Sequence, residues 1–140
     1  MSQRDEFAEI QELLDEVCGP RAAMFVGSRS FLDVATYVNG YLGGRCYGNG
    51  MNLTQYIRLF GIWLATRHSK PRNIGWGRIV LEVCDQVNEL ALEHAPRLFN
   101  EFCIECGEFD KKRWFEEFGP FMQPWSEQPR TAPRFSPSSE

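Results

Sequence analysis

The sequence has no hydrophobic run long enough to cross a membrane. The longest nearly uncharged apolar stretch, residues 59–66, is far shorter than the roughly 20 residues that a spanning helix needs. The first ten residues, MSQRDEFAEI, are charged where a secretory signal would carry an apolar segment. The five cysteines are odd in number and irregularly spaced, which argues against a disulfide framework and for a reducing compartment. We therefore expect a cytoplasmic protein without membrane contact.

A β-sheet pattern is also missing. No run of five or more residues alternates apolar and polar side chains, whereas apolar residues recur at helical spacing. We predict an all-α protein, a compact bundle of five or six helices that forms one domain over residues 1–118. The predicted helices cover residues 3–17, 31–42, 53–68, 76–87 and 88–106, with a short sixth helix over 110–118. Pro96 lies inside the fifth and predicts either a kink or two shorter helices that meet near Ala95.

The composition changes after Gly119. Five of the eight prolines fall in the last 21 residues, a density that excludes a continued helix. The same segment carries four large apolar side chains that are costly to leave in water: Phe121, Met122, Trp125 and Phe135. We therefore predict that residues 119–140 form an extended, proline-rich tail that docks across the helices.

The stretch AAMFVGSRSFLD, residues 22–33, resembles both a phosphate-binding loop and an ordinary helix start. A phosphate-binding P-loop needs a lysine followed by Ser or Thr, and this stretch has no lysine. We interpret residues 22–26 as a short extended or irregular segment and Gly27 as a turn residue with positive φ. Ser30 is then expected to cap the second helix, with Asp33 completing a capping box.

Catalytic and metal-binding motifs are weak or absent. Cys103 and Cys106 have the spacing of a zinc half-site, but no second pair accompanies them, and we interpret them as buried hydrophobic residues. His68 and His94 belong to no HExxH motif, and neither lies close in sequence to a candidate nucleophile. We expect no catalytic, cofactor or metal site and a protein that is not an enzyme. An enzyme would instead have a cleft that holds a histidine beside a carboxylate or a thiol.

The net charge of −4 conceals three segments of alternating sign. Residues 4–16 hold six acids and one base, residues 21–78 hold eight bases and one acid, and residues 79–108 hold seven acids and one base. In one interpretation, acidic helices pack beside basic ones and their fields partly cancel. In the other, one segment forms a surface of a single sign that attracts a partner of opposite charge.

The glycine-rich stretch 43–50 offers a further candidate surface. Tyr41 lies just before this stretch and Tyr47 lies within it, and tyrosines in or beside flexible loops are common in recognition surfaces. The alternative interpretation is a plain solvated connector.

A family resemblance rests on the order and spacing of motifs over residues 20–105. The motifs are an apolar segment that leads to a glycine, a Ser-Arg-Ser turn, a helix that ends in Gly-Tyr, a Phe/Trp-rich helix, and a Gly-Trp pair before an aliphatic helix. The matching residues are Met24, Phe25, Val26, Gly27, Ser28, Arg29, Ser30, Tyr37, Gly40, Tyr41, Phe60, Trp63, Leu64, Arg67, Gly75, Trp76, Ile79, Phe99 and Phe102. In this pattern the chain resembles small bacterial immunity proteins associated with polymorphic toxin systems of the Rhs and type VI kinds.

The resemblance implies a non-enzymatic antitoxin that binds a cognate antibacterial toxin and occludes its active site. Toxins of the nuclease or ADP-ribosyltransferase type have basic clefts, so an N-terminal acidic face and a later acidic face are the first predicted contacts. The aromatic segment from Trp114 to Trp125 is the second. The candidate contact residues are Asp5, Glu6, Glu9, Glu12, Asp15, Glu16, Glu89, Glu93, Glu101, Glu105, Glu108, Trp114 and Trp125.

A nucleic-acid-binding regulator is the alternative hypothesis. Its surface would be the basic middle segment, where Arg67, Lys70, Arg72 and Arg78 interleave with Trp63 and Trp76. The overall pI of about 5.3 makes nucleic acid the less expected partner.

Overall fold

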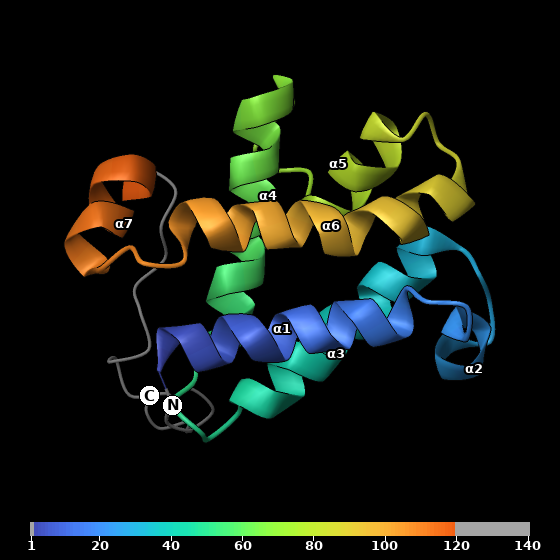
Figure 1. Ribbon diagram of the computed structural model, residues 1–140, viewed down its shortest axis with the longest axis horizontal. Helices are drawn as coiled ribbons and strands as arrows, with labels where there is room; N and C mark the ends of the chain where they lie inside the picture. The colour runs from blue at the N-terminus through green and yellow to red at the C-terminus, as the bar shows by residue number, and fades with distance from the viewer. Residues whose placement is uncertain (1, 120–140) are drawn as a thin grey trace, which may run out of the picture.

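Seven α-helices and no strand make up residues 2–119, the part of the chain that the computed structural model describes (Figure 1). The helices are α1 (Gln3–Val17), α2 (Ala22–Val26), α3 (Phe31–Cys46), α4 (Leu53–His68), α5 (Trp76–Val83), α6 (Asn88–Cys106) and α7 (Lys111–Phe118). The all-helical prediction is confirmed, with more helices than the five or six expected. The predicted docking of the proline-rich tail concerns residues that lie outside the described range.

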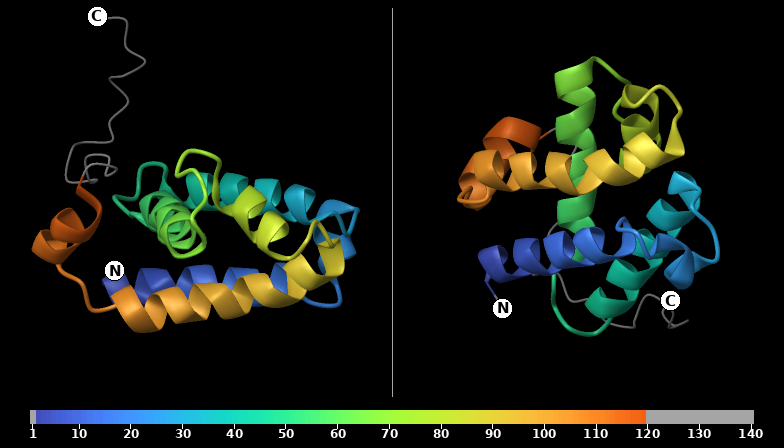
Figure 2. Two further views of the ribbon diagram at one scale, coloured as in Figure 1. Left: turned by 90° about the horizontal axis from the view of Figure 1, so that it is seen from above. Right: turned by 45° about the vertical axis from the view of Figure 1, so that its right-hand side comes forward.

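The larger helices form two layers. Helices α1 and α6 run antiparallel and side by side in one layer, and α4 crosses behind both of them (Figure 1). Helices α3 and α5 pack on α4 in the second layer, and α7 lies at the end of α6 (Figure 2). The short α2 lies in the connection between α1 and α3.

An aromatic cluster joins α1, α4, α6 and α7. The ring of Phe102 lies 5.6 Å from that of Phe7, 5.6 Å from that of Trp63 and 6.1 Å from that of Trp114, measured between centroids. All four side chains are buried. Burial of a large apolar side chain contributes about 1.5–3 kcal/mol, so this cluster anchors the short α7 to the rest of the bundle.

Gln3 completes the attachment of α7. Its Nε2 donates to the carbonyl oxygens of Gly107 at 2.8 Å and Phe109 at 2.9 Å, and its Oε1 accepts from the indole N–H of Trp114 at 3.0 Å. The start of α1 therefore holds the connection between α6 and α7 in place. At this end of α1, Ser2 and Asp5 form a capping box.

The second long helix starts at Phe31 as predicted, but two predictions on either side of that start are wrong. Residues 22–26 form the helix α2 rather than an extended segment. Helix α3 continues through Gly43 and Gly44 to Cys46, although we expected it to end at Leu42. Cys46 is buried one turn after Leu42, and this burial favours the longer helix.

The structure also differs from the sequence-based predictions at the end of α5 and within α6. Helix α5 ends at Val83 because Asp85 and Gln86 have φ values of 57° and 64°, which turn the chain before α6 begins. Helix α6 is a single helix that contains Pro96, so the alternative of two shorter helices is wrong. The carbonyl of Pro96 accepts a hydrogen bond from Nε2 of Gln11 at 3.0 Å, which ties this part of α6 to α1.

Candidate binding surface

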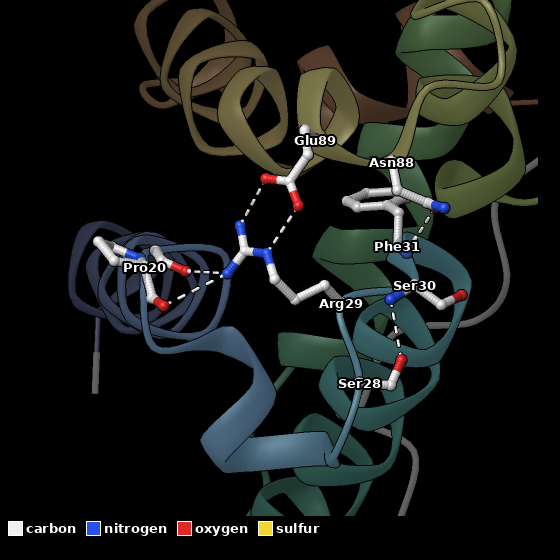
Figure 3. A network of polar contacts seen from close by, with 8 residues as sticks. Pro20, Ser28, Arg29, Ser30, Phe31, Asn88 and Glu89 are labelled. Atoms are coloured by element: carbon white, nitrogen blue, oxygen red, sulfur yellow. Dashed lines mark hydrogen bonds and ion pairs between the residues drawn. The ribbon is translucent and has the colours of Figure 1, made fainter.

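The Ser-Arg-Ser turn before α3 is a structural junction. The guanidinium of Arg29 donates to both carboxylate oxygens of Glu89, at 2.7 and 2.8 Å, and Nη1 donates to the carbonyls of Gly19 and Pro20 at 3.3 Å (Figure 3). This hydrogen bonding lowers the pKa of the Glu89 carboxyl. One side chain thus joins the end of α1, the turn before α3 and the start of α6.

The cap of α3 differs from the one that the sequence predicts. Ser30 occupies the cap position, but its side chain makes no capping hydrogen bond. Instead Oδ1 of Asn88, from the first residue of α6, accepts the backbone N–H of Phe31 at 2.8 Å (Figure 3). Ser28 accepts the N–H of Ser30 at 2.8 Å and donates to Asp33 at 2.9 Å. Gly27 has a φ of 74°, as predicted.

The later acidic face, formed by Glu89, Glu93, Glu101, Glu105 and Glu108, is largely neutralised within the fold. Its carboxylates lie beside basic side chains, two of which, Arg29 and Arg67, come from the basic middle segment. The pairs are Glu89 with Arg29 (2.7 Å), Glu93 with Arg97 (3.8 Å), Glu101 and Glu105 with Arg67 (3.9 and 3.1 Å), and Glu108 with Arg4 (2.9 Å). On this side of the molecule, acidic and basic segments pack together, and four bases offset most of the charge of the five carboxylates.

Two of the six N-terminal acidic residues, Glu6 and Glu9, contact other helices or their caps through their carboxylates. Glu6 is 4% exposed, and its carboxylate accepts the backbone N–H of Asn52 at 2.6 Å. Burial raises the pKa of Glu6. Glu9 forms a two-point ion pair with Arg45 of α3, at 2.6 and 2.9 Å. We therefore leave Glu6 out of the exposed surface.

The remaining four N-terminal acidic residues are exposed on α1: Asp5, Glu12, Asp15 and Glu16. Within the described residues none of them forms an ion pair with a base. Asp5 takes part in the cap of α1, and Asp15 accepts from Gln11 at 3.1 Å. The N-terminal face therefore keeps a negative charge that the fold does not compensate.

An open groove runs between this face and α3. It has a volume of about 510 Å³ and is lined by Asp5, Ala8, Glu9, Glu12, Leu13, Glu16, Tyr41 and Arg45. We call it the acidic groove. Arg45 is its one basic lining residue and is already paired with Glu9, so the free charge of the groove is negative.

Aromatic side chains extend from the acidic groove toward α2. The rings of Phe25 and Tyr37 lie 6.2 Å apart and those of Tyr37 and Tyr41 lie 6.4 Å apart, between centroids. We call these three residues the aromatic row. Tyr41 is 43% exposed, and Met24, next to Phe25 in the chain, is 72% exposed. Phe25 and Tyr37 are partly buried and pack against the core, so Tyr41 is the exposed ring of the row. The sequence singles out Tyr41, whereas the exposure of Met24 becomes apparent only in the structure.

The aromatic candidates from the sequence do not form an exposed surface. Trp114 is 1% exposed and belongs to the core, and Trp125 lies outside the described residues. Trp63 and Trp76 are each 4% exposed, so neither ring is open for stacking against a nucleic acid base. Lys70, from the same basic segment, pairs with Glu82 at 3.4 Å.

Cys106 is buried, as expected, whereas Cys103 is only partly buried. Burial raises the pKa of both Cys103 and Cys106 to about 12. Across residues 2–119, no group of three or more potential metal ligands comes together, and no helix in that range is long and apolar enough to cross a membrane.

No family model, curated protein or solved structure matches this chain. The two acidic faces of the chain differ in one respect: the later face is paired with bases, whereas Glu12 and Glu16 of the N-terminal face are not.

Proposed function

We propose that this protein is an immunity protein that binds a cognate antibacterial toxin and neutralises it by occluding the toxin's active site. The observation that supports this proposal is the uncompensated acidic groove, which the exposed ring of Tyr41 helps to line. Charged groups that a fold does not pair internally remain available for a partner, whereas the carboxylates of the later acidic face are already engaged.

The chemistry of the groove fits a basic partner. Nucleases and ADP-ribosyltransferases bind anionic substrates, and a basic cleft that attracts phosphates also attracts a row of carboxylates. A negative face accelerates the encounter with such a cleft. Association rate constants under electrostatic attraction of this kind reach about 10⁸–10⁹ M⁻¹s⁻¹ at low salt. Acidic residues that enter the cleft would also exclude the substrate from it.

The packing supports inhibition by a preformed surface. Helix α1 carries the acidic face and is anchored from below by Phe7, Ile10 and Leu14, which are at most 4% exposed. A surface held by a packed core loses little conformational entropy on binding, and this lowers the cost of association.

The alternative, a nucleic-acid-binding regulator, has less support from the structure. Four bases of the middle segment, Arg29, Arg45, Arg67 and Lys70, are held in ion pairs, and its two tryptophans are buried. Nucleic acid binding of functional strength would fall steeply with salt concentration, which a titration of DNA and RNA at two ionic strengths tests directly.

Charge reversal tests the proposed function. The probe is the toxin encoded by the neighbouring gene, in a catalytically inactivated form for binding and in its active form for protection of cells. Reversal of Glu12, Asp15 and Glu16 to lysine is expected to weaken binding about 100-fold, if each charge contributes about 1 kcal/mol, and to abolish protection.

The matched control reverses Glu93, Glu101 and Glu105, which have the same charge but lie in the neutralised face. This variant is expected to retain most of its affinity once its folding has been checked by circular dichroism. Absence of binding by the unaltered chain, or full protection by the variant with three lysines on α1, would contradict the proposal.

A further inference from the structure

One face of α3 combines two tyrosines with two glycines. Tyr37, Gly40, Tyr41 and Gly44 follow one another at steps of three, one and three residues, so they share a single face of the helix. Both glycines are exposed, and this face borders the acidic groove through Tyr41. We call these four residues the tyrosine–glycine face.

The two glycines are not required by the fold. Glycine inside a helix is destabilising relative to alanine by roughly 0.5–1 kcal/mol. A Cβ atom added at Gly40 or at Gly44 would meet nothing within 4 Å, and neither residue has a positive φ. Alanine would therefore fit at both positions and strengthen the helix. Bare backbone beside two aromatic rings is instead what close approach of another molecule needs.

The tyrosines also lack a role in the polar structure of the chain. Within the described residues, neither the hydroxyl of Tyr37 nor that of Tyr41 takes part in a hydrogen bond. The ring of Tyr37 is partly buried against the core, whereas that of Tyr41 is 43% exposed. Tyrosine combines a rigid apolar ring with a polar end, and it is enriched at the centres of protein interfaces. Tyr41 belongs both to the aromatic row and to the lining of the acidic groove, so we expect it to be the central contact residue of this face.

We infer that the tyrosine–glycine face is the docking surface for the toxin, an inference that rests on the proposed function. A backbone segment of the toxin lies against Gly40 and Gly44, and basic side chains beside that segment stack on Tyr41 and pair with Glu12 and Glu16 in the acidic groove. A guanidinium suits this position because it binds both an aromatic face and a carboxylate.

Charge complementarity selects a basic partner over a second copy of this chain. A two-fold contact through Gly40 and Gly44 would bring the acidic groove of one copy beside that of the other, since the groove includes Tyr41 from the same face. Like charges at an interface oppose association. A positively charged toxin surface gains from the same carboxylates.

The test uses glutamine, a neutral residue that favours helix formation, at two neighbouring positions. Gly44→Gln covers the tyrosine–glycine face, whereas Gly43→Gln is the matched control because Gly43 lies about 100° around the helix. A Cβ atom at Gly43 also meets nothing within 4 Å. Both variants are expected to raise the urea concentration at the unfolding midpoint, and only Gly44→Gln is expected to weaken toxin binding, by about 30-fold or more, as loss of a central contact does.

Isothermal calorimetry with the inactivated product of the neighbouring gene measures the affinities, and Tyr41→Ala gives a second measure with an expected loss of similar size. If toxin binding is equal for Gly43→Gln and Gly44→Gln, or unaffected by Tyr41→Ala, the tyrosine–glycine face is not the docking surface. The proposed function would still stand. Failure of the unaltered chain to bind the toxin contradicts both. A dimer of the unaltered chain in light scattering that Gly44→Gln disrupts would assign the face to a second copy and overturn the inference.

Discussion

The carboxylate of Glu6 accepts the backbone N–H of Asn52 at 2.6 Å, which connects the first turn of α1 to the residue that precedes α4. Glu6 is 4% exposed and has exposed acidic neighbours along α1. In the sequence it is indistinguishable from those neighbours. In the fold it satisfies a backbone donor at a helix start, where a negative charge is also favoured by the helix dipole.

Replacement of Glu6 by glutamine is expected to change the pH dependence of stability. Burial raises the pKa of Glu6 above its ordinary value of 4.5, against the opposing effect of the Asn52 hydrogen bond. The folded protein therefore holds this proton more tightly than the unfolded chain does, and its stability falls as the pH rises above about 4.5. Glutamine keeps an acceptor for Asn52 without the charge. The stability of Glu6→Gln relative to the natural chain should rise between pH 4 and pH 7, as measured by urea unfolding. A difference that does not change with pH would contradict this prediction.

Two alanine substitutions distinguish the cap that the sequence predicts from the one in the structure. Asn88→Ala removes the acceptor of the Phe31 N–H and is expected to lower the free energy of unfolding by about 1 kcal/mol, the usual cost of a lost helix cap. Ser30→Ala removes a hydroxyl that makes no capping hydrogen bond and should cost less than about 0.5 kcal/mol. Chemical denaturation of both variants decides between them, and the reverse order of effects would restore Ser30 as the cap.

Alanine at Gly77 is expected to have the opposite effect to alanine at Gly43. A Cβ atom at Gly77 would lie 2.7 Å from the Cβ of Ala35, so α3 and α5 must separate, at a cost of about 1–3 kcal/mol. At Gly43 the space is open, and alanine should stabilise the helix by roughly 0.5–1 kcal/mol. Thermal unfolding of the two variants compares them. Similar melting temperatures would mean that the contact between α3 and α5 is looser than described.

Cys103 and Cys106 are expected to resist alkylation in the folded protein. Burial raises the pKa of each thiol to about 12, so almost none of the reactive thiolate is present at pH 8. Iodoacetamide should label both residues far more slowly without urea than with it, as followed by mass spectrometry. Rapid labelling of the folded protein, or uptake of one zinc ion per chain, would instead support a redox or metal role for the pair.

The elements predicted most accurately are those whose apolar spacing is strong. Residues 3–17, 53–68 and 88–106 are helices with the predicted bounds, because their buried stripes repeat every three to four residues over several turns. The errors lie where tertiary contacts outweigh local preference. Gly43 and Gly44 indicate a helix end, yet α3 continues because Cys46 is buried and Arg45 reaches Glu9 of α1.

The amino-acid sequence alone determined the helical class, the positions of the long helices and the segregation of charge, because these depend on spacing along one chain. Only the tertiary structure decided which charges remain available. Arg29 and Arg67 are brought to the carboxylates of α6 from far away in the sequence, while Glu12 and Glu16 meet no base in the described residues. Ion pairing depends on distances of a few ångströms between side chains of different helices, and no pattern along the chain specifies those distances.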